Sequence, residues 1–267
     1  MTSAGVQSDE PYVGPPHHPL QTADVWVQNT SADAPWLIYV HGGGFRDPVV
    51  TKSNGYTLIH QKVLANPSLN AASINYRLSP HPAYAGEDNN ALYPDHLDDV
   101  LAALLYLKTT HGMSAKRFIL TGHSAGAALI FQAIPKLTDI SFPPFAAVGA
   151  SGIYDMPGLI EEYPEYLDFI LGAFGEDREL WKVASPTLVG RSAAYADYAG
   201  KVVLIHSDDD ELLSWKQTIG FKNMIDAQPG REGNKTLVIA TNGKHEEVPE
   251  GKALSDVVDS LLADLMH

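Results

Sequence analysis

The chain has 267 residues, of which 45% are apolar and 19% charged, so it can build one sizeable core. Its formal net charge of −14 argues against nucleic-acid and anionic-membrane partners, because their phosphates would be repelled. The absence of cysteine excludes disulfides, thiolate metal sites and a cysteine nucleophile, and it is compatible with a reducing compartment.

Residues 1–22 are rich in proline, glycine and serine, and we expect an extended lead-in before a single domain over residues 23–267. The lead-in lacks the basic start and apolar core of a signal peptide, and no stretch of the chain is long and apolar enough to span a bilayer. We therefore expect a cytoplasmic protein. His17 and His18 could pair on a metal, but solvated polar side chains are the interpretation we favour, and we expect no metal.

Short apolar runs then alternate with longer amphipathic ones. Strands are predicted at residues 24–29, 35–43, 71–78, 117–122, 145–153, 201–207 and 235–242. Helices are predicted at residues 56–66, 95–112, 125–134, 214–225 and 253–267, with Gly112 as a helix stop. Continuous Val/Ile/Leu runs separated by helices indicate an α/β fold, with a mostly parallel sheet covered by helices on both faces.

Residues 154–197 interrupt this alternation. The segment is rich in tyrosine, proline and glutamate, too long for a connection and too irregular for one helix. We expect a small cap-like insertion over the carboxyl edge of the sheet, where open α/β sheets bind ligands.

The stretch "ILTGHSAGAA", residues 119–128, places Ser124 between a predicted strand and a predicted helix. It matches G-x-S-x-G, the turn that presents a nucleophilic serine in the α/β-hydrolase fold, and its small residues leave the serine uncrowded. A glycine-rich turn with a passive serine is the alternative. In this strand–turn–helix setting we predict a nucleophile.

A nucleophilic serine needs a base and an acid, which follow it in the order serine, acid, histidine in this fold. His206, His245 and His267 follow Ser124. His206 lies within a strand and is expected to pack there, His267 is the last residue, and His245 lies in a loop after the last strand. We predict His245 as the base. In "HSDDDELL", Asp210 is the favoured acid and Asp208 the next candidate.

The motif "HGGGF" at residues 41–45 ends an early buried strand, where the loop that supplies oxyanion-hole N–H groups is found. Glycines let this backbone approach a substrate closely. We predict the N–H groups of Gly43, Gly44 and Ala125 as the oxyanion donors. His41 precedes Ser124, so we interpret it as a support for the loop rather than as the base.

Four stretches, "INYRLSP", "GHSAGA", "GIYD" followed by "LIEEYPEY", and "HSDDDELL", together resemble the fungal kynurenine formamidases (arylformamidases), from about residue 36 to the C-terminus. The pairing of HGGG with GHSAG also resembles the hormone-sensitive-lipase-like esterases, so the third stretch discriminates most. The formamidase family usually has HGG-x-W, whereas Phe45 stands at the last position here. The resemblance matches Ser124, Asp210 and His245 to the family triad.

The resemblance implies hydrolysis of N-formyl-L-kynurenine to L-kynurenine and formate, a step of tryptophan degradation, with a small-molecule partner and no cofactor. A homodimer is left open. A formyl group is small, so an aromatic wall is expected on the aryl side. The candidates for that wall are Phe45, Tyr154, Tyr163, Tyr166 and Trp215. The alternatives are a carboxylesterase of the hormone-sensitive-lipase-like type, for instance in secondary metabolism, and a non-catalytic binding module on the same scaffold.

Overall fold

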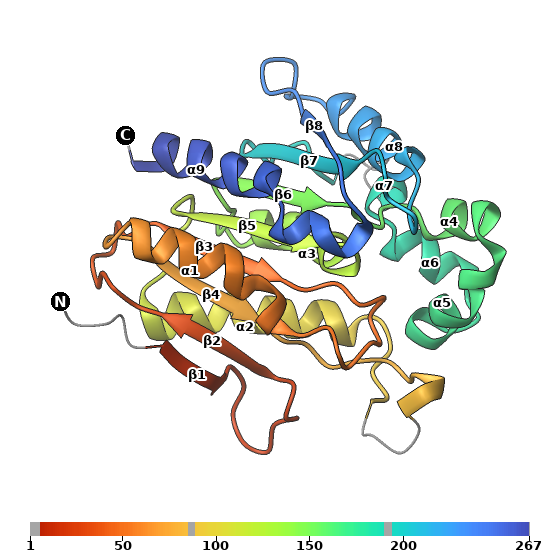
Figure 1. Ribbon diagram of the computed structural model, residues 1–267, viewed down its shortest axis with the longest axis horizontal. Helices are drawn as coiled ribbons and strands as arrows, with labels where there is room; N and C mark the ends of the chain where they lie inside the picture. Colours follow the sequence, from red (N-terminus) through yellow and green to blue (C-terminus); the bar gives the residue numbers. More distant parts are fainter. Residues whose placement is uncertain (1–5, 85–88, 190–193, 267) are drawn as a thin grey trace.

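A computed structural model describes residues 6–84, 89–189 and 194–266. The strands within these residues form one eight-stranded sheet in the order β1-β2-β4-β3-β5-β6-β7-β8 (Figure 1). Strands β3 to β8 run parallel to one another, whereas β2 is antiparallel to both β1 and β4. The strands are β1 (Val6–Pro11), β2 (Thr22–Trp26), β3 (Trp36–Val40), β4 (Asn70–Ile74), β5 (Phe118–His123), β6 (Ala146–Ala150), β7 (Lys201–Ser207) and β8 (Leu237–Thr241).

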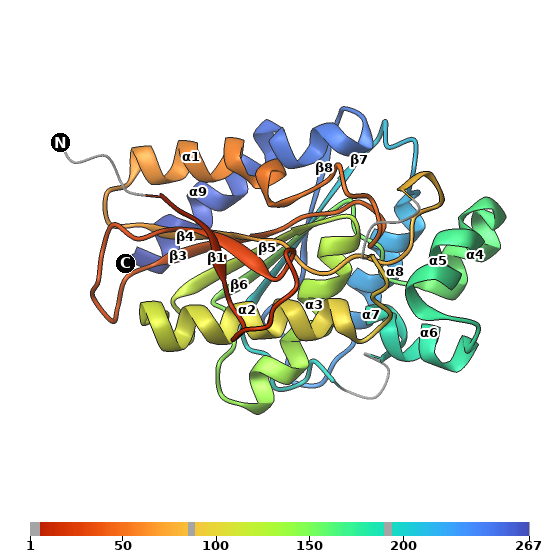
Figure 2. The same ribbon diagram turned by 90° about the horizontal axis from the view of Figure 1, so that it is seen from below.

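Helices cover both faces of the sheet, which confirms the predicted α/β class. Figure 2 shows α1 and α9 on one face and α2 and α3 on the other. The central strands are buried along their whole length because both faces are covered. Gly112 ends α2 in the left-handed conformation, as its position in the sequence predicts. The larger helices are α1 (Tyr56–Ala65), α2 (Asp95–His111), α3 (Ala125–Asp139), α8 (Trp215–Asp226) and α9 (Lys252–Met266).

The N-terminal lead-in contributes β1 to the edge of the sheet, a strand that the sequence analysis does not predict. Buried Asp24 on β2 accepts hydrogen bonds from Lys52 Nζ at 2.6 Å and from the Tyr56 hydroxyl. Lys52 Nζ also reaches Asp9 on β1 at 2.5 Å. The side chains of β1 are largely exposed, so β1 is held by its pairing with β2 and by these charges, while Tyr12, just after β1, packs in the core.

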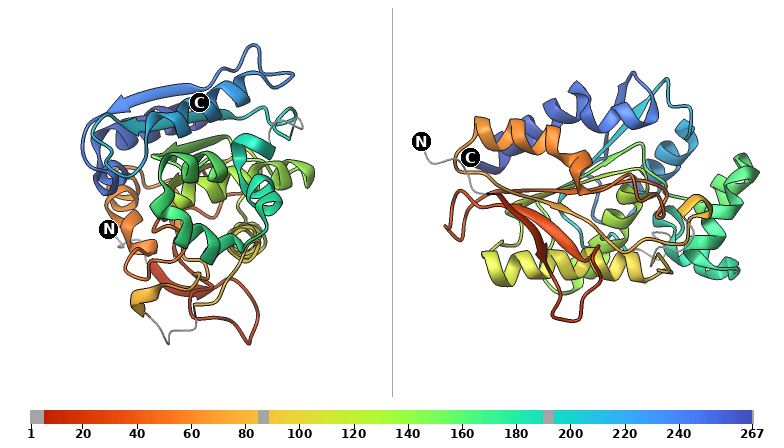
Figure 3. Two further views of the ribbon diagram at one scale, coloured as in Figure 1. Left: turned by 90° about the vertical axis from the view of Figure 1, so that its right-hand side faces the viewer. Right: turned by 60° about the horizontal axis from the view of Figure 1, so that its bottom comes forward.

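The segment expected as an insertion folds into four short helices through residue 189. These helices are α4 (Met156–Glu162), α5 (Leu167–Phe174), α6 (Arg178–Ala184) and α7 (Pro186–Val189). Residues 190–193, within the expected 154–197 range, lie outside the described residues. Helices α4, α5 and α6 lie beyond the carboxyl ends of the central strands (Figure 1), and the left view of Figure 3 looks onto this edge with them in front.

None of the helices in the described part of the chain combines the length and the apolar surface that crossing a bilayer would require.

Candidate active site

Ser124 lies at the sharp turn between β5 and α3. Its backbone adopts φ 52° and ψ −117°, a conformation that costs an L-residue about 1–3 kcal/mol. The turn is held from both sides, because the Ser124 N–H donates to Ala150 O at 2.9 Å and its carbonyl accepts from Ile153 N at 3.3 Å. A rigid frame therefore holds the serine in a strained position.

The two glycines of the motif are required by close packing. A Cβ on Gly122 would lie 2.5 Å from the carbonyl oxygen of Gly126. A Cβ on Gly126 would lie 2.3 Å from the carbonyl oxygen of Val40 and 2.4 Å from that of His41. The first turn of α3 thus packs directly against the end of β3, which brings the serine turn and the HGGGF loop together.

His245 and Asp210 meet at the same edge of the sheet. His245 Nδ1 lies 2.9 Å from Asp210 Oδ2 and 3.0 Å from Oδ1, and both side chains are almost fully buried. Burial alone would raise the pKa of Asp210, but its hydrogen bonds with His245 and with the Leu213 N–H outweigh burial and hold that pKa below its ordinary value. Asp210 is therefore a carboxylate that accepts from Nδ1–H, and no hydrogen bond to Nε2 of this imidazole is found among the described residues.

The other candidate residues of this region make different contacts, although His206 Nε2 lies 4.0 Å from Asp210 Oδ2. Asp208 accepts from Trp215 Nε1 at 3.0 Å rather than from the imidazole. His206 is buried in β7, bonded to the Leu213 carbonyl oxygen and to the Thr218 hydroxyl. His267 lies outside the described residues.

Several contacts that the sequence analysis missed fix the loop of His245. Glu211 accepts from the backbone N–H of His245 at 3.0 Å, and the Ser207 hydroxyl donates to the Gly243 carbonyl oxygen. The His123 ring lies 4.7 Å from the His245 ring, and its Nε2 is 3.1 Å from the His245 carbonyl oxygen. Burial, followed by the repulsion of His245, lowers the pKa of His123 to about 3, so His123 adds no positive charge beside the base at neutral pH.

Ser124 and His245 line one cavity of about 240 Å³ at the carboxyl edge. The described residues include no hydrogen bond between Ser124 Oγ and His245. Such bonds are often long in the absence of substrate and tighten when it binds, so the shared cavity is the relevant geometry.

The glycine loop forms another wall of this cavity. Gly43 and Gly44 line it with φ of +85° and +56°, values that favour glycine. Within the described part of the chain, no backbone or side-chain acceptor takes the N–H of either residue. Ala125 is the first residue of α3, and its N–H has no partner within the helix.

Residues behind the glycine loop hold its shape. The Tyr76 hydroxyl donates to the carbonyl oxygen of Gly42 at 2.8 Å and contacts that of His41 at 3.1 Å. The rings of Tyr76 and His41 stack at 4.3 Å. Burial lowers the pKa of His41 to about 4, so it is neutral at neutral pH, and its role is support, in agreement with the interpretation from sequence.

The predicted aromatic wall needs correction, because Tyr166 is the one of the five candidates that lines this cavity. Phe45 is fully buried and packs on Phe174 at 5.1 Å, so it anchors the glycine loop instead. Tyr154 is buried against Phe221 at 4.6 Å.

The remaining two candidates also lie off the cavity. Tyr163 stacks on Tyr166 at 5.2 Å, which places it beside the wall rather than in it. Trp215 packs on His206 at 4.7 Å. Position in the chain does not distinguish a core ring from a cavity ring, so no sequence signal separates these candidates.

Eight further residues line the cavity without having been predicted: Arg46, Asp47, His81, Ile153, Phe169, Leu212, Leu213 and Glu246. Arg46 and Asp47 directly follow the HGGGF motif and Glu246 directly follows His245, so proximity to the motifs could have identified them. Phe169 on α5 could not have been found this way.

One group of potential metal ligands lies in the described residues at this site. The ligand atoms of His123, His245 and Glu246 are within 4.8 Å of one another. Nδ1 of His245 is bonded to Asp210, and Nε2 of His123 to the His245 carbonyl oxygen, so these two contacts use one nitrogen of each imidazole.

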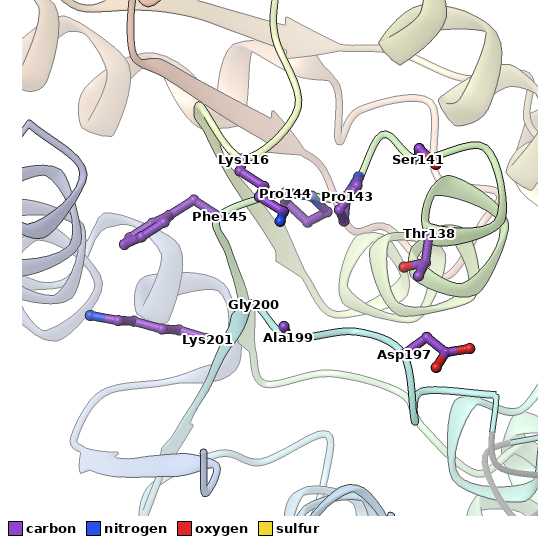
Figure 4. A pocket seen from close by; sticks show the side chains of 10 residues that line it. All are labelled: Lys116, Thr138, Ser141, Pro143, Pro144, Phe145, Asp197, Ala199, Gly200 and Lys201. Atoms are coloured by element: carbon purple, nitrogen blue, oxygen red, sulfur yellow. The ribbon is translucent and has the colours of Figure 1, made fainter. Parts of the chain in front are cut away.

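A larger hollow of about 510 Å³ lies at the opposite, amino edge of the sheet (Figure 4). Lys201 at the start of β7 and Phe145 just before β6 lie side by side in it, with Lys116 close by. Lys201 Nζ pairs with Asp264 at 2.6 Å. The described residues that line this hollow include a carboxylate, Asp197, but no histidine to serve as the base of a serine triad.

Comparisons with known proteins identify relatives among hydrolases. The family model BD-FAE matches residues 24–136. A kynurenine formamidase of Aspergillus versicolor is 36% identical over 86% of this chain and 91% of its own length. A kynurenine formamidase-like hydrolase of Fusarium equiseti is 32% identical over 90% of this chain and 88% of its own length.

Solved structures share the fold. A truncated carbohydrate esterase from gut microbiota has a TM-score of 0.74 at 17% identity, covering 100% of this chain and 98% of that one. Esterase B of Lactobacillus rhamnosis has a TM-score of 0.72 at 17% identity, covering 98% and 84%. At this level of identity the likeness shows the α/β-hydrolase fold and nothing finer.

Proposed function

Because the chain belongs to the kynurenine formamidase family of α/β-hydrolases, we propose that it hydrolyses N-formyl-L-kynurenine to L-kynurenine and formate. The observation that carries the proposal is the single cavity lined by Ser124, His245 and the glycine loop, with Asp210 behind the imidazole. The cavity of about 240 Å³ lies below the usual range for ligand pockets, which suits a small substrate.

In the first half of the proposed reaction, Ser124 Oγ attacks the formyl carbon while Nε2 of His245 takes the hydroxyl proton. The negative charge that develops on the formyl oxygen is stabilised by the N–H groups of Gly43, Gly44 and Ala125. The C–N bond then breaks as His245 returns the proton to the departing aryl amine. L-Kynurenine leaves, and the formyl group remains as an ester on Ser124.

In the second half, His245 takes a proton from water, and the resulting hydroxide equivalent attacks the formyl ester. The C–O bond to Ser124 breaks, the serine recovers its proton from His245, and formate leaves. Asp210 keeps the proton of the imidazole on Nδ1 and offsets the positive charge that the ring carries between the steps.

The test compares the wild-type enzyme with Ser124→Ala on N-formyl-L-kynurenine. Wild type should release kynurenine, and a fluorophosphonate probe should label it. The variant should lose labelling and at least about 10³-fold in kcat, because the attacking oxygen is gone. Turnover by the variant within tenfold of wild type would contradict the role of Ser124, and absence of labelling in the wild type would favour a non-catalytic binding module.

A carboxylesterase activity is the second candidate, because the structural neighbours include esterases. Short p-nitrophenyl esters distinguish the two functions. If butyryl or longer esters are hydrolysed as fast as N-formyl-L-kynurenine, the result would favour the esterase.

A cytoplasmic location and a homodimer remain predictions. Imaging of the tagged protein tests the first, and light scattering on the eluting peak of a sizing column tests the second.

A further inference from the structure

Arg46 brings a positive charge to the candidate active site at a fixed position. It follows Phe45, whose buried ring anchors the glycine loop, and its own N–H donates to the Gly43 carbonyl oxygen at 3.0 Å. Its side chain lines the cavity that contains Ser124 and is 21% exposed. The guanidinium is therefore held by the same loop that supplies the proposed oxyanion donors.

Most of the donors of Arg46 are uncommitted. Nη1 contacts Asp168 Oδ2 at 2.5 Å, and the guanidinium carbon lies 5.8 Å from the centre of the Phe169 ring. No other acceptor for Arg46 is found among the described residues. A guanidinium carries five N–H donors, and Asp168 is 68% exposed, so this ion pair is weak and leaves a fork of donors for a second carboxylate.

The surroundings of Arg46 are acidic. Asp47 and Glu246 line the same cavity, and Glu211 lies at the loop of His245. Desolvation raises the pKa of Glu246, and the carboxylates of Asp47 and Glu211 act in the same direction, while His245 opposes them. At neutral pH the amino-acid end of N-formyl-L-kynurenine carries an ammonium as well as a carboxylate. The acidic side chains suit the ammonium, but they would repel the carboxylate unless a cation received its charge.

We infer that Arg46 binds the carboxylate at the amino-acid end of the substrate, so that the enzyme selects aryl formamides whose leaving amine carries an anion. Arginine pairs with a carboxylate through two parallel N–H···O bonds, which fixes orientation as well as charge. Phe169 and Tyr166 line the cavity beside it and can contact the aryl ring. The inference rests on the proposed formamidase function.

The experiment measures kcat and KM of Arg46→Gln on two substrates. The first is N-formyl-L-kynurenine. The second is 2′-formamidoacetophenone, which keeps the formanilide ring and ketone but lacks the amino-acid group. For the first substrate kcat/KM should fall on the order of 10–100-fold, mainly through KM, because a charge-assisted pair is lost. For the second it should stay within about threefold, which also shows that the variant is folded.

Two further variants make the comparison specific. Lys216→Gln removes a positive charge from an exposed side chain on α8 that does not line this cavity, and it should leave both substrates unaffected. Arg46→Lys keeps the charge but loses the fork, so it should recover part of the loss on N-formyl-L-kynurenine.

The outcomes separate the two proposals. An equal fall on both substrates would assign Arg46 a structural role and overturn the inference, as would unchanged kinetics on both or an equal effect of Lys216→Gln. A wild-type enzyme that hydrolyses neither formanilide would instead refute the proposed function, and the carboxylate role of Arg46 with it.

Discussion

Replacing Asp210 by asparagine should abolish most of the activity by reversing one hydrogen bond. Oδ1 of Asp210 accepts from the N–H groups of Leu212 and Leu213 at 3.0 and 2.9 Å, and Oδ2 lies 2.9 Å from His245 Nδ1. An asparagine must keep its single oxygen toward the two backbone donors, because an amide NH₂ there would face two N–H groups. Its NH₂ then points at His245 Nδ1 and donates to it.

The consequence is the wrong tautomer of the imidazole. With Nδ1 as an acceptor, the proton of neutral His245 moves to Nε2. A protonated Nε2 can no longer take the proton from the Ser124 hydroxyl. The equivalent change in other triads costs about 10⁴ in kcat, or about 5.4 kcal/mol at 1.36 kcal/mol per decade. The fold should persist, because both backbone donors keep their acceptor.

The assay is kcat for N-formyl-L-kynurenine, with circular dichroism to check the fold. Asp208→Asn is the matched control, because Asp208 contacts Trp215 and not His245, and its effect should stay within about threefold. An Asp210→Asn enzyme within tenfold of wild type, or a larger loss for Asp208→Asn, would refute the reasoning.

Three other changes test separate parts of the structure. Gly126→Ala places a Cβ 2.3 Å from the Val40 carbonyl oxygen, so it should cost about 1–3 kcal/mol in urea unfolding and at least tenfold in kcat/KM; wild-type values would mean that this close approach is not required. Tyr166→Ala should raise KM for N-formyl-L-kynurenine about three- to tenfold and leave ringless formamides unchanged, and an equal effect on both would remove Tyr166 from the aryl wall. Burial lowers the pKa of His96 from 6.5 to about 4, so below pH 6.5 the unfolded chain gains a proton that the folded chain does not, and stability is lost as pH falls toward 4. Between pH 7 and 4.5, the free energy of unfolding in urea should fall by about 2–3 kcal/mol less for His96→Gln than for wild type. If the two proteins lose stability in parallel over this pH range, the reasoning is contradicted.

Local sequence was sufficient for the parts of the site that depend on chain order and strand position. Parallel strands end at one edge, so residues just beyond β5, β7 and β8 had to meet there, and the sequence therefore predicted that Ser124, Asp210 and His245 would be neighbours. The glycines around Ser124 could also be interpreted from the sequence, because only a residue without Cβ fits where α3 touches the end of β3.

Tertiary packing decided which aromatic and charged side chains face the cavity. Phe45 has φ +65°, and its ring lies against Phe174 in the core, so the next residue, Arg46, reaches the cavity instead. Phe169 joins the wall through the placement of α5, more than forty residues beyond the serine in the sequence. An apolar ring is buried equally well in a core or in a pocket, so its identity and spacing do not predict in which of the two it lies. The packing of the short helices over the sheet edge determines this.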